Sequence, residues 1–243
     1  MARGCVFCGS LPTTKEHAIP RWLAGPLGGG GLMTHEYLEP PDGAAPTRRW
    51  RSHQPTIEVK DVCAPCNHGW MEGLESSVRP FLGPMIRGEP ATLTPGRCES
   101  LTTWLLKTVL MLQLAEPTER RIVRLGLYAE LYKLRRPSGR LQAWVARNDF
   151  KAGVAAGARG LAVQRGEFPV EQTWAHALVL GSVTLVLVDL GIGSARPILV
   201  EAPLAHALGP LWPHPVGGEF PPPVRIGREQ QRLILHLLAY SAR

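Results

Sequence analysis

Two pairs of cysteines are the strongest chemical signal in the sequence. Cys5 and Cys8 form one Cys-x2-Cys motif, and Cys63 and Cys66 form a second one. Two such turns can direct four thiolates at a tetrahedral zinc ion, with sulfur ligands about 2.3 Å from the metal. Disulfides, a redox pair and an iron–sulfur site are the alternatives, but a reducing compartment disfavours disulfides and a redox pair needs only one motif. The spacing therefore favours a structural Zn²⁺ site.

Residues that could carry catalysis lie close to these cysteines. Four thiolates leave no open position for water, so such a zinc ion does no chemistry itself. The loop after the first pair contains Glu16 and His17, and Asn67 and His68 directly follow the second pair. An imidazole, with an unperturbed pKa of about 6.5, suits a general base at neutral pH. A carboxylate and an amide oxygen suit a hard ion such as Mg²⁺, which also binds substrate phosphate.

The order of these residues resembles the HNH endonucleases of the four-cysteine type. The shared pattern is Cys-x2-Cys, then Glu-His-x-Ile-Pro, then Cys-x2-Cys-Asn at the start of a helix, and it covers about residues 1–80. The resemblance implies a ββα-metal finger related to the treble clef. It also implies that His17 is the general base and that Glu16 and Asn67 hold one divalent cation, Mg²⁺ or Mn²⁺. The implied activity is hydrolysis of DNA phosphodiester bonds, with RNA as an alternative substrate.

The match to this family pattern is incomplete. His68 is a competing metal ligand, and an imidazole would favour Zn²⁺, Mn²⁺ or Ni²⁺ over Mg²⁺. The family's usual middle Asn is absent from Thr56–Val62, so a backbone carbonyl or Gln54 would have to orient the ring of His17. Neighbouring side chains on a strand point to opposite sides. The segment must therefore bend if Glu16 and His17 are both to face one phosphate.

These observations support three hypotheses about function. The leading one is a metal-dependent HNH endonuclease. The main alternative is a zinc-stabilised module that binds nucleic acid or a partner without catalysis, and the missing middle Asn favours it. The third is a zinc finger fused to a ligand-sensing domain, which the net positive charge argues against.

The charge of the chain points to an anionic partner. It has 27 Lys and Arg against 20 Asp and Glu, a net charge of +7, and a pI of about 9.5. Residues 1–80 hold eight side chains of each sign, so the whole excess lies in residues 81–243. A solvated helix face would explain the basic residues of segment 119–140 as well as phosphate contacts would. The arginines expected to contact nucleic acid are Arg21, Arg48, Arg49, Arg51, Arg120, Arg121 and Arg124.

Periodicity predicts the elements that must position these residues. Apolar residues at helical spacing after Asn67 predict a helix that ends near Pro80. Two more helices are expected at 100–116 and 119–134, and the first is apolar nearly all round and therefore central. From Arg140 the period changes to two. Strands are expected at 141–147, 161–165, 173–180 and 183–190, with a Gly181-Ser182 hairpin, and a last helix at 228–239.

The sequence as a whole predicts an α+β protein. We expect a treble-clef-like zinc finger with nuclease function at 1–82, a connector at 83–98 and an α+β domain at 99–243. The last would contain two or three helices and a small antiparallel sheet, and would position DNA, form a homodimer or recognise a partner. The apolar stretch 101–115 carries Lys107 and is shorter than the roughly 20 residues of a membrane span. The chain start lacks the pattern of a signal peptide, so a cytoplasmic location without membrane contact is expected.

Overall fold

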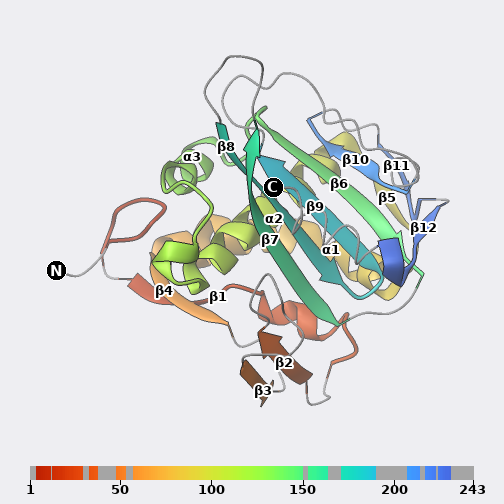
Figure 1. The fold of residues 1–243 in the computed structure, drawn as a ribbon, viewed down its shortest axis with the longest axis horizontal. Helices are drawn as coiled ribbons and strands as arrows, with labels where there is room; N and C mark the ends of the chain where they lie inside the picture. Colours follow the sequence, from red (N-terminus) through yellow and green to blue (C-terminus); the bar gives the residue numbers. More distant parts are fainter. Residues whose placement is uncertain are drawn as a thin grey trace.

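The computed structural model describes residues 4–11, 13–29, 33–37, 48–52, 57–149, 153–163, 171–189, 207–213, 217–222 and 224–230. Within these ranges the fold combines helices with mostly antiparallel strands (Figure 1), which confirms the predicted α+β class. No helix in the described part of the chain is both long enough and apolar enough to cross a bilayer.

The first cysteine pair is followed by a strand that pairs with the strand leading to the second pair. β1 (Thr13–His17) runs antiparallel to β4 (Glu58–Cys63), and the short 3-10 helix η1 (Arg21–Ala24) comes directly after β1. The pairing register shifts between Thr14 and Glu16, where β4 holds an extra residue. Such a bulge bends the strands locally, and it lies just before the predicted catalytic residues.

The long insert between these strands contains a separate ribbon. β2 (Met33–Tyr37) pairs antiparallel with β3 (Arg48–Ser52). After β4, a short helical segment, η2 (Cys66–Met71), leads into α1 (Glu72–Arg87). The backbone kinks at Gly69, whose φ of −97° and ψ of −107° are not helical.

Helix α1 continues past Pro80, so the predicted helix end is wrong, and it also contains Pro84. A proline inside a helix removes a backbone hydrogen bond and costs roughly 3 kcal/mol. Burial of a large apolar side chain stabilises by about 1.5–3 kcal/mol. Packing therefore outweighs the proline penalty, because the turns after Pro80 bury Phe81, Leu82, Met85 and Ile86. The helix ends at Gly88, whose φ of 83° favours glycine.

Helix α2 (Pro95–Ala115) is the central helix predicted at 100–116, and it begins five residues earlier. The side chain of Thr94 caps it by accepting a hydrogen bond from the backbone N–H of Arg97 at 3.3 Å. Pro95 occupies the first helical position, where a missing N–H costs nothing. Most side chains of α2 are buried, including that of Lys107.

The helix predicted at 119–134 is wrong in its first half. A short turn, η3 (Thr118–Arg120), precedes α3 (Gly126–Leu134). The guanidinium of Arg121 donates hydrogen bonds to the carbonyls of Leu114 at 2.9 Å and of Glu116 at 3.1 Å. Because this segment caps the end of α2, it does not begin a helix of its own.

The second half of the chain forms a six-stranded sheet in the order β10-β6-β9-β8-β7, with β12 paired parallel to β6. Its predicted strands are confirmed, although β7 begins seven residues before its predicted start. Gly181, at φ 54°, and Ser182 form the predicted hairpin turn between β8 and β9. The strands are β6 (Leu141–Asn148), β7 (Val154–Val163), β8 (Glu171–Leu180), β9 (Val183–Asp189), β10 (Gly209–Trp212) and β12 (Arg225–Ile226).

A small strand pair lies at the side of this sheet. β5 (Ala91–Leu93) runs antiparallel to β11 (Gly218–Phe220). Of the last predicted helix, only residues 228–230 lie in the described part of the chain, and they are helical.

One buried core joins the N-terminal elements to the sheet. It contains Val62 of β4, Leu82 of α1, Leu105 of α2 and Leu185 of β9, and α1 and α2 lie against one face of the sheet (Figure 1). The predicted connector at 83–98 consists of the end of α1, β5 and the first turn of α2. The domain limits stay a prediction, but the packing across them is continuous.

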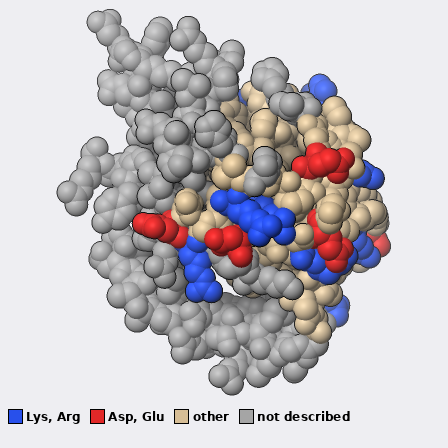
Figure 2. Space-filling model, turned by 90° about the vertical axis from the view of Figure 1, so that its right-hand side faces the viewer, with Lys and Arg blue, Asp and Glu red and all other residues tan. Residues whose placement is uncertain are grey.

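Charges on the face beside β5, β10 and β11 are mixed. Figure 2 shows basic and acidic side chains interspersed over its described part. Arg87, the last residue of α1, and Glu89, just before β5, form an ion pair at 2.7 Å. The described residues of this face therefore offer no continuous basic patch of the kind that grips a polyanion.

Candidate metal centre and adjoining pocket

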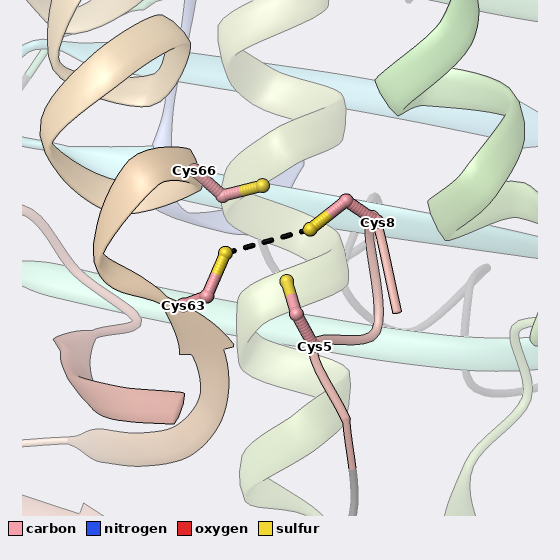
Figure 3. Close-up of side chains that lie close together, drawn as sticks. All are labelled: Cys5, Cys8, Cys63 and Cys66. Atoms are coloured by element: carbon pink, nitrogen blue, oxygen red, sulfur yellow. Dashed lines mark hydrogen bonds between the residues drawn. The ribbon is translucent and has the colours of Figure 1, made fainter. Parts of the chain in front are cut away.

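The four cysteines of the two motifs converge on one point (Figure 3). Their Sγ atoms all lie within 4.8 Å of one another, and those of Cys8 and Cys63 are 3.4 Å apart. Ligands about 2.3 Å from a tetrahedral zinc ion lie roughly 3.8 Å from each other, so the cluster has the dimensions of such a site. These four cysteines could hold a metal ion such as zinc.

A tight turn positions the first pair. The backbone N–H of Gly9 donates to the carbonyl of Cys5 at 2.7 Å, and the N–H of Cys5 donates to the carbonyl of Ser10 at 2.9 Å. Gly9 has a φ of 79°, which side chains disfavour. A Cβ atom at Gly4 would lie 2.3 Å from the carbonyl oxygen of Gly9. Both glycines are therefore required for the turn.

The ionisation of these thiols depends on their surroundings. A hydrogen bond with Ser10 lowers the pKa of Cys8 to about 6, whereas burial raises the pKa of Cys63 and of Cys66. A cation at the centre of the cluster would favour the thiolate form of the two buried groups.

A surface pocket of about 230 Å³ is lined by residues that include Asn67, which directly follows Cys66 in the chain. Its walls come from the end of β1, from η1, from η2 and from one face of α1. On that face of α1, Glu72, Glu75 and Arg79 recur at helical spacing. The pocket is lined by Glu16, His17, Pro20, Arg21, Trp22, Asn67, His68, Glu72, Glu75 and Arg79.

The structure brings the predicted metal ligands Glu16 and Asn67 together, and the Asn67 side chain forms a hydrogen bond with the Glu16 carboxylate. Burial raises the pKa of Glu16, and Glu75 raises it further. Lys107 and the Asn67 hydrogen bond act in the opposite direction. A partly buried carboxylate that is repelled by a second one gains from a nearby cation.

His17 lines the same pocket as Glu16, although the two residues are adjacent in the chain. The bulge before Glu16 and the end of β1 at His17 supply the bend that the sequence analysis requires. The His17 Nε2 atom lies 3.6 Å from Glu58 Oε1, an ion-pair distance that is too long for a good hydrogen bond. Glu58 is the register partner of His17 on β4. It therefore lies on the strand in which the family's Asn, the usual partner of the His ring, is missing.

The arginines predicted to contact nucleic acid lie in different elements. Arg21 lines the pocket. Arg121 caps α2, and Arg124 forms an ion pair with Glu130. The backbone of Arg48, Arg49 and Arg51 lies in β3, Arg120 lies in η3, and Gln54 falls outside the described residues.

Several residues in or near the pocket were not predicted from the sequence. Glu72, Glu75 and Arg79 follow His68 at positions i+4, i+7 and i+11, so a helical projection from Asn67 onward would have found them. Glu58 could have been found from its place in the strand that lacks the family's Asn. Lys107 was visible as the one charged residue in the apolar stretch 101–115.

Comparison of the chain with protein-family models, with curated proteins and with solved structures gave no match. The likeness to HNH endonucleases therefore depends on the motif residues and on their arrangement in the pocket.

Proposed function

We propose that this protein is a metal-dependent endonuclease of the HNH type that hydrolyses DNA phosphodiester bonds. The observation that carries the proposal is the shared pocket. Asn67 follows Glu16 and His17 by about 50 residues in the chain, yet all three residues line one surface pocket.

In the proposed reaction, His17 is the general base. With its Nε2 side facing Glu58, the ring can accept a proton from water at Nδ1, and the carboxylate stabilises the resulting imidazolium. The water oxygen then forms a bond to phosphorus in line with the bond to the 3′ oxygen, which breaks. The departing oxygen takes its proton from water.

Glu16 and Asn67 would hold the divalent cation, Mg²⁺ or Mn²⁺. A carboxylate and an amide oxygen fit such a hard ion, and His68 lines the same pocket as the alternative ligand. When bound, the ion supplies stabilisation of the negative charge on the leaving oxygen.

Two arginines at the pocket could hold the phosphates on either side of the cleaved bond. Arg21 and Arg79 both line the pocket. The Arg79 guanidinium lies 5.4 Å from the ring centre of Trp22, a cation–π contact that restricts its position. Such an arrangement supports a substrate with a phosphate backbone.

Plasmid nicking tests the proposal. Wild-type protein with Mg²⁺ or Mn²⁺ is expected to nick supercoiled DNA, and His17→Ala is expected to slow the reaction by about 10²–10⁴-fold. His68→Ala is the matched control and should retain most activity if Asn67 is the ligand. Equal activity of wild type and His17→Ala would refute the assignment. DNA retardation without cutting would favour the non-catalytic binding module.

Metal analysis tests the cysteine site separately. About one tightly bound zinc ion per chain is expected, and Cys63→Ser should lose it together with the local fold. Full-length protein that remains folded after complete zinc removal would contradict a structural role for the ion.

A further inference from the structure

Helix α2 carries one buried lysine that reaches the pocket wall. The side chain of Lys107 is fully buried, and its Nζ lies 2.6 Å from Glu75 Oε1 of α1. Glu75 lines the pocket, whereas Lys107 lies behind it. The pair thus connects the core of the molecule to the proposed active site.

Stability alone does not account for this ion pair. Two charges taken out of water lose several kcal/mol of solvation each, and well-packed apolar residues in their place are often neutral or stabilising. The rest of α2 around Lys107, including Trp104 and Leu110, is already buried in an apolar core. An apolar side chain at position 107 would fit these surroundings.

The pair also acts on the proposed metal ligand. Lys107 lowers the pKa of Glu16, and Glu75 raises it. The Glu75 carboxylate accepts one short hydrogen bond from Lys107 and has further acceptor positions for the pocket.

We infer that Lys107 is a positioning residue, which fixes the Glu75 carboxylate so that it can accept hydrogen bonds from water around a divalent ion held by Glu16 and Asn67. This inference rests on the proposed function, because it concerns the same cation. Groups that orient the surroundings of a metal ion commonly change its affinity by about 10–100-fold when they are removed.

The test replaces both charges at once. The double variant Glu75→Leu/Lys107→Met keeps the net charge, so a general change of electrostatic potential cannot explain its effect. We expect thermal stability at or above that of the wild type, Mn²⁺ affinity lower by at least about tenfold in calorimetry, and a lower kcat with an unchanged KM for DNA.

Two further variants complete the test. Arg140→Met/Asp189→Leu removes another largely buried ion pair, 2.6 Å apart in the sheet, and should leave Mn²⁺ affinity unchanged. Glu75→Gln removes the carboxylate at constant size, and it should weaken Mn²⁺ binding even if the double variant does not fold.

The outcomes separate this inference from the proposed function. Wild-type Mn²⁺ affinity and full activity in the folded double variant or in Glu75→Gln would overturn the role of Lys107, while leaving the nuclease intact. If the wild type binds Mn²⁺ but does not cut DNA, the nuclease fails and the affinity of the variants still decides the inference. A wild type that binds no Mn²⁺ overturns both.

Discussion

At the scale of single residues, Glu58 fills the place that the family pattern leaves open. The sequence lacks the Asn that usually holds the catalytic His, but β4 pairs Glu58 directly with His17. In the proposed mechanism, the Glu58 carboxylate, 3.6 Å from Nε2 of His17, would take the place of the missing amide beside the ring. The missing Asn is therefore no argument that catalysis has been lost.

Glu58→Gln is expected to slow DNA nicking by on the order of tenfold, less than the loss of the base itself, because orientation is retained only in part and the charge is lost. Lys15→Gln is the control, since Lys15 also contacts Glu58, at 3.3 Å, and does not line the pocket. Nicking rates under single-turnover conditions distinguish the two. If both variants lose activity equally, the ion pair with Lys15 matters and the contact with His17 does not.

At the scale of elements, α1 is stabilised by its packing more than by its own sequence. Pro80 is exposed on a helix whose following turns are buried. Replacing this proline should therefore regain the stability that a proline inside a helix costs.

Pro80→Ala is expected to stabilise the protein by about 1–3 kcal/mol, because it restores the backbone hydrogen bond to α1. For a chain of this size that corresponds to a rise in Tm of a few degrees. The matched control is Pro95→Ala at the first position of α2, where proline is favourable, so Tm should stay level or fall. Calorimetry checks both, and a lower Tm for Pro80→Ala would show that the proline is required.

At the scale of the whole molecule, the cysteine cluster and the sheet share one core. Cys63 and Met71 belong to the same buried cluster as Trp104 of α2 and Leu187 of β9. The buried residues of the N-terminal region therefore form one cluster with those of α2 and the sheet.

Residues 1–98 expressed alone are expected not to unfold cooperatively, even with zinc, because the apolar face of α1 would be exposed to water. The full chain under the same conditions should show a sharp transition. Circular dichroism during heating and resistance to proteolysis measure the difference. A protected, cooperatively folded fragment would instead show that the zinc site and its local contacts suffice.

Local chemistry was the predictable part of this protein. The Cys-x2-Cys spacing predicts the cluster, because a tight turn with two residues between the cysteines brings their thiolates close together in any fold. Strands β6, β8 and β9 follow from a period of two, and the pairing of Glu16 with Asn67 follows from the motif.

Tertiary contacts explain what the sequence analysis missed. Continuation of α1 past Pro80 depends on burial against α2, and the cap formed by Arg121 depends on where α2 ends. The contact between Lys107 and Glu75 joins positions 32 residues apart on two helices, and no periodicity within either helix reveals it.

The contact between Lys107 and Glu75 also bears on protein engineering. A designer who transplants the cysteine motifs, the His17 loop and α1 into a new scaffold would carry Glu75 along and leave Lys107 of α2 behind. Such a chimera would carry a buried carboxylate without its counter-charge. The smallest unit that could carry the proposed chemistry therefore extends through α2, and a graft that ends with α1 needs an engineered cation at the position of Lys107.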